Sequence, residues 1–369
     1  MVRGAGRCPA VQWEAAIGSS LELGIFHEFA CRQGQSEAES FAESFELADA
    51  AEDWGLDAIW LAELHFAPGR SVLAAPLTIA AAIAARTERM KIGTAVQVLP
   101  LANPLRLAEE VATVDQISRG RLIFGVGRSG FARVYEAYGI PYEESRERFA
   151  EALAIMCSAW TEPAFSYEGR FHSYHSVSLT PKPYQRPYPP IRVAANSADT
   201  FPAAGEQGHA LLVAVRLGTL TELVPNILAY RAAYRAAGHP GEGQVFLRLP
   251  IYIGETAEQA IDEPEVSIMQ FYRGLGAQLE KSATGPGARP IESRADRGQR
   301  LQSVSYEEAR REKVIVGTPA MVVDRLQALR DELGLNGILA ELNCGGLIPH
   351  ERVRRSLRLL CHEVLPAFR

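Results

Sequence analysis

The fold is decided by residues 58–98, which read AIWLAELHFAPGRSVLAAPLTIAAAIAARTERMKIGTAVQV. Ala58–Leu61 is a short apolar run typical of a strand, and Lys91–Val98 is a second one. Between them, Pro76–Arg86 has apolar residues at helical spacing, after a proline that suits a first helical turn. Parallel strands need a crossover of this kind, so the stretch predicts a parallel α/β sheet.

The same alternation of strand and helix runs from about residue 21 to the end of the chain. The other predicted strands are Leu21–Phe26, Arg121–Val126, Ile191–Ala195, 210–215, Val245–Ile253 and 336–342. The other predicted helices are 38–54, 104–118, 143–161, 200–207, 219–237, 319–333 and 350–364. Eight strand–helix units close naturally into a (β/α)8 barrel. An open doubly wound sheet with a second domain uses the same elements, but the absence of a clean central linker favours the barrel.

Two segments interrupt this rhythm. Residues 163–190 contain six prolines, and residues 263–303 are rich in Gly, Pro, Arg, Gln and Ser. We therefore predict one barrel domain over residues 21–369 with insertions at these two places, preceded by a loose tail over residues 1–20.

Composition excludes several classes of protein. The net charge is −6, which does not fit an electrostatic nucleic-acid binder, and no apolar run approaches the about 20 residues of a membrane span. The five cysteines form no CxxC or His/Cys cluster, so no metal site is predicted, and the first 20 residues lack the apolar core of a secretory signal. A cytoplasmic protein is expected. Because 34 of the 38 basic residues are arginine, a GC-rich bacterial source is also expected.

One glycine-rich motif follows the fourth predicted strand. Gly125-Val126-Gly127-Arg128-Ser129-Gly130 fits GxGxxG. A dinucleotide fingerprint would follow the first strand and open a helix, whereas here the next predicted helix begins only near residue 143. We favour a glycine-lined bend at the mouth of the barrel, where a flat ligand approaches closely and Arg128 reaches a phosphate.

A second phosphate candidate is the segment Asn196-Ser197-Ala198-Asp199-Thr200, after the strand Ile191–Ala195. Amides and hydroxyls at a strand-to-helix turn make an anion-binding concavity. The same residues equally suit a plain helix N-cap, and the local sequence does not separate the two interpretations.

Acid–base candidates follow three predicted strands. His27 and Glu28 come after the first, Glu63 and His65 after the second, and Asn343 and Cys344 after the last. In a parallel barrel these strand ends meet on one face, where active sites lie. A single histidine is more often structural, but polar residues after three separate strands favour a catalytic face.

Six motifs, in this order and spacing, resemble the bacterial-luciferase-like family of flavin-dependent oxidoreductases. They are Gly55–Phe66, Ile92–Val96, Leu99–Glu109, Val114–Arg121, Phe124–Arg128, and the later stretches Ile191–Ser197 and Val316–Pro319 taken together. The resemblance covers about Leu21 to Leu365. It implies a TIM barrel that binds reduced FMN from a separate reductase and uses O2, through a C4a-peroxyflavin, to oxidise a small organic substrate. It also implies a homodimer.

The resemblance assigns roles to particular residues. The flavin phosphate would be held by Arg128, Ser197 and Thr200 with the Asn196 amide beside them, while Arg146 matches the flavin-side arginine of the family. Ala95–Val96 matches a cis peptide beneath the flavin ring, next to Gly127. The segment 263–303 corresponds to a mobile active-site lid.

The chain departs from the luciferases themselves at two positions. Leu64 replaces the first of two adjacent histidines, and Gly127 stands where catalytic subunits have a reactive cysteine. Aldehyde bioluminescence is therefore not expected, and His65 or His27, together with Glu63, become the proton-transfer candidates. Two alternatives stay open: hydride transfer with the deazaflavin F420, and a non-catalytic partner subunit, which Leu64 would suit.

Overall fold

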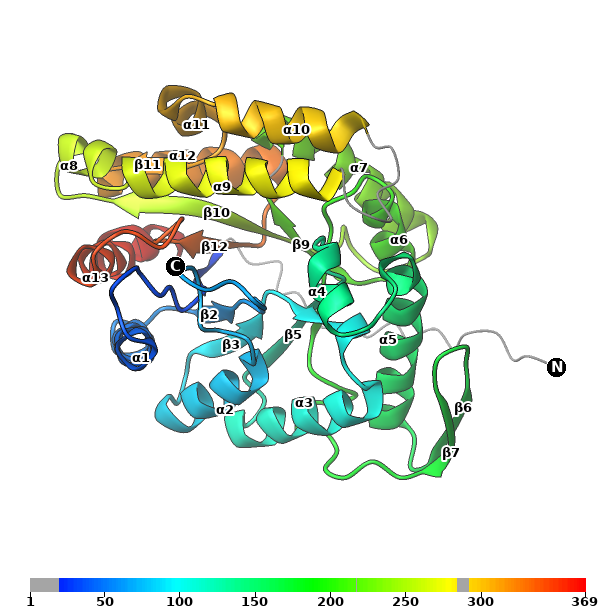
Figure 1. The fold of residues 1–369 in the computed structure, drawn as a ribbon. Coiled ribbons are helices and arrows are strands. Elements are labelled where there is room, and N and C mark those ends of the chain that lie inside the picture. Colours follow the sequence, from blue (N-terminus) through cyan, green and yellow to red (C-terminus); the bar gives the residue numbers. More distant parts are fainter. Residues whose placement is uncertain (1–19, 217, 284–291) are drawn as a thin grey trace.

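The computed structural model describes residues 20–216, 218–283 and 292–369. Eight parallel strands close a barrel in which β1 pairs with both β2 and β12. Figure 1 shows the helices arranged around these strands. In barrel order these strands are β1 (Glu22–His27), β2 (Ala58–Leu61), β3 (Lys91–Thr94), β5 (Leu122–Gly127), β8 (Ile191–Ala194), β9 (Ala210–Ala214), β10 (Val245–Ile253) and β12 (Gly337–Glu341). The predicted (β/α)8 barrel is confirmed, and the open sheet is excluded, because the last strand returns to the first.

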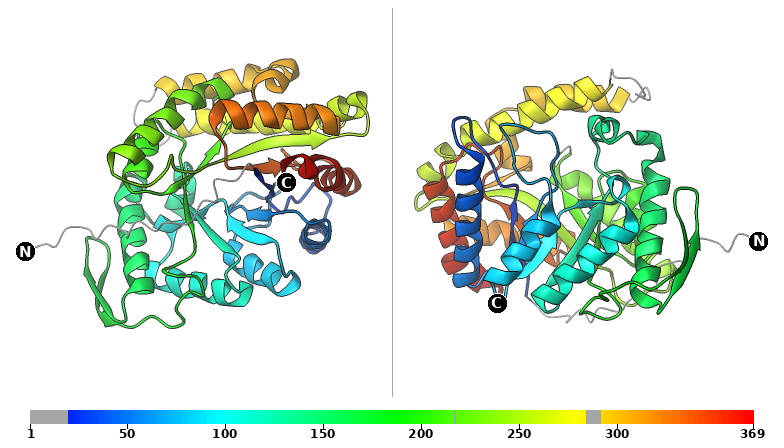
Figure 2. Two further views of the ribbon diagram at one scale, coloured as in Figure 1. Left: turned by 180° about the vertical axis from the view of Figure 1, so that it is seen from behind. Right: turned by 60° about the horizontal axis from the view of Figure 1, so that its bottom comes forward.

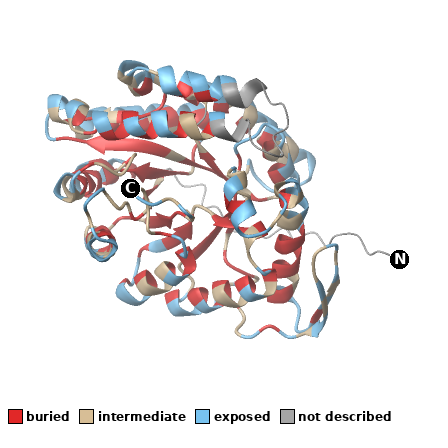
Figure 3. Ribbon diagram, in the orientation of Figure 1, coloured by how far each residue is buried: buried red, intermediate tan, exposed pale blue. Residues whose placement is uncertain are grey.

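Helices surround the strands and expose their outer faces, while the strands are buried (Figure 3). The helices between successive barrel strands are α1 (Glu37–Asp53), α2 (Pro76–Arg86), α3 (Pro104–Ser118), α4 (Ala132–Ala137), α5 (Ser145–Thr161), α6 (Thr200–Glu206) and α7 (Leu220–Ala236). Between β10 and β12 lie α8 (Ala257–Asp262), α9 (Glu265–Ala283), α10 (Glu292–Ser303), α11 (Tyr306–Glu312) and α12 (Pro319–Leu333), and α13 (His350–Leu359) follows β12. Two short strands add to the sheet: β4 (Gln97–Val98) pairs with β5, and β11 (Ile315–Gly317) pairs with β10.

Three sequence expectations need correction. Lys91–Val98 is not one strand, because a cis peptide between Ala95 and Val96 separates β3 from β4. The segment 163–190 is not wholly irregular, since β6 (Phe165–Glu168) and β7 (Ser173–Val177) form an antiparallel hairpin. The described part of 263–303 consists mainly of α9 and α10, which run side by side in both views of Figure 2.

The expected tail, residues 1–20, lies outside the described residues except for Ser20. No helix in the described part of the chain has both the length and the apolar character needed to cross a membrane.

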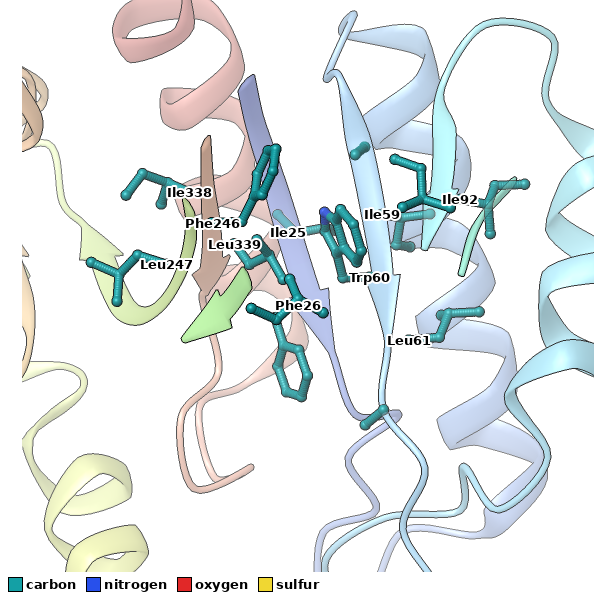
Figure 4. Close-up of a cluster of buried hydrophobic side chains, with 14 of the residues drawn as sticks. Ile25, Phe26, Ile59, Trp60, Leu61, Ile92, Phe246, Leu247, Ile338 and Leu339 are labelled. Atoms are coloured by element: carbon teal, nitrogen blue, oxygen red, sulfur yellow. The ribbon is translucent and has the colours of Figure 1, made fainter. Parts of the chain in front are cut away.

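Alternate residues of each strand point into the barrel, as the period of a strand requires. The interior is narrow at Gly24 and Gly93, where an added Cβ would lie 3.0 Å from Trp60 Nε1 and 2.2 Å from Trp60 Cε3. These two glycines therefore make room for the indole, which Figure 4 shows inside the barrel near Phe246. The outward-facing Ile59, Ile92 and Ile338 pack against the helices.

The N-terminal end of the barrel is filled by a buried ion pair and aromatic rings. The Arg192 guanidinium lies over the rings of Trp60 and Phe246, 4.7 and 3.3 Å from their centroids. It also pairs with Glu22 at 3.0 Å, and Lys91 pairs with the same carboxylate at 2.8 Å. These contacts leave the opposite end, where the strands finish, as the face on which a site can form.

Candidate functional site

The C-terminal face has one half built from small residues. Gly125 and Gly127 of β5 lie against the end of β3, because an added Cβ would meet Thr94 O at 1.8 Å and Val96 Cγ2 at 2.5 Å. The Thr94 hydroxyl donates to the Gly125 carbonyl at 2.7 Å. The first two glycines of the GxGxxG motif thus let two strands approach beside the cis peptide Ala95–Val96, and this half forms a floor without bulky side chains. This arrangement agrees with the glycine-lined bend.

A hydrogen-bonded chain of polar side chains runs along the edge of this floor. The Glu63 carboxylate accepts from the Val98 amide at 2.8 Å and from Gln97 Nε2 at 2.6 Å. Its other oxygen lies 2.7 Å from His65 Nε2, and the Tyr138 hydroxyl lies 3.3 Å from His65 Nδ1. Glu63 is therefore placed to hold the ring proton on Nε2, which leaves Nδ1 facing Tyr138. The structure brings Glu63 and His65 together as one unit.

The second histidine candidate lies elsewhere. His27 ends β1 with its side chain on the outer side of the barrel, where it lines a small pocket with Ser44 and Leu47 of α1 and with His350. Burial lowers the pKa of His27 to about 4, so the ring is neutral at pH 7. The structure does not bring His27 to the face that holds Glu63 and His65, because odd-numbered residues of β1 point away from the lumen.

The predicted phosphate ligands gather at one corner of the floor. Arg128 Nη1 lies 3.5 Å from the Ser145 hydroxyl, and the next residue, Arg146, pairs with Asp199 at 2.5 Å. The Ser197 and Thr200 hydroxyls are 2.9 Å apart in the loop that carries Asp199. Asn196 is exposed at the start of this loop.

Local contacts hold this corner in place. The Tyr135 hydroxyl donates to the Arg128 carbonyl, and its pKa is raised mainly by burial. A hydrogen bond from Ser197 and the charge of Arg146 lower the pKa of Asp199, although partial burial opposes them. Asp199 is therefore a carboxylate at neutral pH and holds Arg146 until another anion competes for it.

The other half of the same face carries charged side chains that the sequence analysis did not assign, apart from Glu28. Arg248 of β10 bridges Glu28 and Glu341 at 3.1 and 2.8 Å, and Arg70 pairs with Glu28 at 2.8 Å. Burial would raise the pKa of Glu28, but the charges of Arg70, Arg248 and Arg216 outweigh it and lower that pKa to about 2. A signal was present, because Arg248 interrupts the apolar strand Val245–Ile253 and Glu341 ends a buried one.

Asn343 and Cys344 do not join either half as acid–base groups. Asn343 caps its own loop through the Ile348 amide, 3.0 Å away, and Cys344 is buried beneath α9 with a raised pKa. No group of three or more His, Cys, Asp or Glu residues in the described ranges is arranged to hold a metal ion.

Comparisons with known proteins agree with this architecture. The chain is 26% identical over 339 residues to the oxygenase component of a flavin-dependent trigonelline monooxygenase from Acinetobacter baylyi, covering 90% of this chain and 91% of that protein. It is 29% identical over 279 residues to an F420-dependent glucose-6-phosphate dehydrogenase from Kineococcus radiotolerans, covering 72% and 77% of the two chains.

Among solved structures, the monooxygenase RslO1 from Streptomyces bottropensis superposes with a TM-score of 0.77 at 28% identity, over 95% of this chain and all of that one. The family model for luciferase-like monooxygenases matches residues 21–337, which include the barrel strands from β1 to β10 and the first residue of β12. The chain therefore belongs to the luciferase-like monooxygenase family.

Proposed function

We propose that this protein is the oxygenase component of a two-component monooxygenase that takes reduced FMN from a separate reductase. Overall, reduced FMN, O2 and the substrate would give FMN, the oxygenated substrate and water. The observation that carries the proposal is the corner where Arg128, Arg146, Ser197 and Thr200 meet, next to a floor of small residues. The proposal includes a homodimer, as the family resemblance implies, and a cytoplasmic location, as the cysteine content suggests.

The donor set fits the two ends of FMN. Two guanidinium groups and two hydroxyls suit a phosphate, because a guanidinium fork matches its oxygens. A flat ring needs a surface without protruding side chains, and the Gly127 floor beside Val96 supplies one. When bound, a reduced flavin supplies the electrons that activate O2.

Within this proposal the protein's own residues position the cofactor and exchange a proton at the edge of the floor. Arg128 and Arg146 bind the phosphate, with Arg146 exchanging its pairing with Asp199. Glu63 fixes the orientation of His65, so that His65 Nδ1 accepts or returns a proton at the edge of the floor. His65 is well shielded, with 11% of its side chain exposed, which keeps this exchange separate from bulk water.

A cofactor titration tests the proposal. Purified protein is titrated anaerobically with reduced FMN, reduced riboflavin and reduced F420, and binding is followed by fluorescence and calorimetry. We expect reduced FMN to bind at least about tenfold more tightly than reduced riboflavin, because charged hydrogen bonds to the phosphate contribute about 1.5–3 kcal/mol. Arg128→Ala should remove most of that preference. Arg133→Ala, at an exposed position of α4, is the matched control.

F420-dependent hydride transfer is the second candidate, because the Kineococcus relative is an F420-dependent enzyme and the match covers 77% of its length. Tight binding of reduced F420 with no preference for FMN would favour it. A lack of binding to any reduced flavin or deazaflavin would reject both enzymatic proposals. Unchanged cofactor binding in Arg128→Ala would instead suit the non-catalytic partner subunit.

A further inference from the structure

The charged half of the C-terminal face contains more positive than negative charge. Three arginines, Arg70, Arg216 and Arg248, stand beside two carboxylates, Glu28 and Glu341. Arg70 and Arg248 are fully used in ion pairs with these carboxylates, at distances of 2.8–3.1 Å. Arg216 forms no ion pair with the described residues, so the cluster holds one positive charge that its own carboxylates do not neutralise.

Arg216 is half-buried, and part of its guanidinium group is shielded although it lacks partners. It follows β9 at the barrel mouth, and its Nε and Nη2 atoms are shielded from solvent without a hydrogen bond from the described residues. The face of the Phe271 ring, on α9, lies near its guanidinium group, 5.6 Å from Cζ to the ring centroid. Leaving buried donors unsatisfied is costly, so such a group calls for a partner, and a bound ligand is one that supplies it.

The surrounding groups increase this deficit of negative charge. Burial and the neighbouring Arg248 and Arg70 lower the pKa of Arg216 to about 10, which still leaves it charged at pH 7. Burial raises the pKa of Glu341, so acidification removes negative charge from the cluster first at this carboxylate. Arg216 is therefore charged at pH 7, and the nearby carboxylates Glu28 and Glu341 form their ion pairs with Arg70 and Arg248 instead.

A second donor lies within electrostatic reach of the same arginine. The Tyr272 hydroxyl, on α9, is buried without a hydrogen-bond partner in the described residues. Its pKa is raised well above the ordinary value, mainly by burial and then by Cys344 and Glu341, so it stays a neutral O–H donor. Arg216, which follows β9, and Tyr272, on α9, thus supply a charged donor and a neutral donor in the same part of the barrel mouth.

We propose that Arg216, assisted by Tyr272, binds the carboxylate of an organic acid substrate. This inference rests on the proposed function, because it assigns the substrate's anionic end to the half of the face opposite the flavin floor. A carboxylate suits the site because its single charge equals the surplus, and its two oxygens match the guanidinium fork. A phosphate would bring more charge next to Glu28 and Glu341. The neighbouring Phe271 ring favours an apolar or aromatic body.

The absence of internal partners makes Arg216 separable from the structural ion pairs. Removing Arg248 would leave two buried carboxylates without their bridge, which destabilises the fold. Removing Arg216 breaks no ion pair. It relieves repulsion from Arg70 and Arg248, which outweighs the attraction to Glu28 and Glu341 that is lost. We therefore expect Arg216→Gln to unfold at the same temperature as the parent protein or a higher one, in the absence of ligand.

Binding of benzoate, measured by calorimetry and ligand-observed NMR at constant ionic strength, tests the inference. Benzoate should bind at least tenfold more tightly than benzamide, its neutral analogue. Arg216→Gln should weaken benzoate binding tenfold or more, and Tyr272→Phe about threefold. Arg325→Gln, which removes an exposed charge from α12, should leave benzoate binding unchanged.

Separate arms identify other anions and isolate the proposed function. Equal benzoate binding by Arg216→Gln and the parent protein would overturn the inference, as would tighter binding of inorganic phosphate than of benzoate. Loss of the preference for FMN over riboflavin in Arg216→Gln would also overturn it, since the flavin phosphate would then be the anion. Because benzoate binding needs no turnover, its failure is distinguishable from failure of the Arg128 titration.

Discussion

Gly127 shows how one missing Cβ shapes the candidate site. A methyl group there would lie 2.5 Å from Val96 Cγ2 and 3.4 Å from the Ala194 Cβ. The first distance is far below van der Waals contact, whereas the second is ordinary. The floor therefore depends on the pair Gly127 and Val96, and the cost of a methyl group is set mainly by the Val96 side chain.

Gly127→Ala should destabilise the protein by about 1–3 kcal/mol, as overpacking does, and should weaken flavin binding. Val96→Ala, introduced as a second substitution, removes the clashing methyl and should restore most of the lost stability. Thermal unfolding and FMN titration of the two single variants and the double variant check this. Additive losses in the double variant would contradict the proposed contact.

At the scale of elements, α9 is fastened to the loop after β12 through one hydroxyl. Ser267, 2% exposed, donates to the Cys344 carbonyl at 2.6 Å and accepts from the Leu347 amide at 3.0 Å. Close approach is built in at Gly345, where an added Cβ would lie 2.0 Å from the Ser267 carbonyl oxygen. This connection holds α9, with Phe271 and Tyr272, over the charged half of the mouth.

Ser267→Ala should cost about 1–3 kcal/mol, because it leaves a buried carbonyl and a buried amide without a partner. Hydrogen exchange should accelerate in α9 and in residues 344–348 before it accelerates in the barrel strands. Ser303→Ala, at an exposed position of α10, is the matched control. Uniform acceleration over the whole chain would show that α9 is not held locally.

Local signals explain which elements were predictable. Pro76–Arg86, Pro104–Ser118 and Pro319–Leu333 have the predicted bounds, since proline marks each start. The α9 helix was missed because composition averaged over 263–303 suggested irregular chain. Its apolar residues nevertheless recur at helical spacing, at Ile268, Phe271, Tyr272, Leu275 and Leu279. The β6–β7 hairpin is largely exposed, so it lacks the apolar alternation of a buried strand.

The candidate site was predictable only where its residues lie close in the sequence. Glu63 and His65 are two positions apart, and their pairing follows from a single loop. Arg248 lies 220 positions from Glu28, and only closure of the barrel brings them together. Arg216 could not be identified from the sequence either, because its significance comes from the hydrogen-bond partners that it lacks in the folded chain.

At the scale of the whole molecule, buried histidines make stability depend on pH. Burial lowers the pKa of His209, which is 8% exposed, to about 4, with His239 adding to the effect. In the unfolded chain a histidine titrates near the ordinary value of about 6.5. As the pH falls from 6.5 to 4, the unfolded state gains a proton that the folded state does not, so stability falls in this window.

His209→Gln should flatten this dependence, by at most about 3 kcal/mol between pH 6.5 and pH 4. Urea unfolding at a series of pH values measures it, with His175→Gln as a control at an exposed position. Equal slopes for His209→Gln and the parent protein would show that His209 is not the group responsible.

The filled N-terminal end of the barrel has a consequence for how small molecules enter and leave. Arg192, between Trp60 and Phe246, closes the end opposite the candidate site. Every small molecule that reaches the interior must then enter and leave through the C-terminal face of the barrel. The proposed cofactor and the proposed substrate would therefore share this one opening, and a product would leave by the same route.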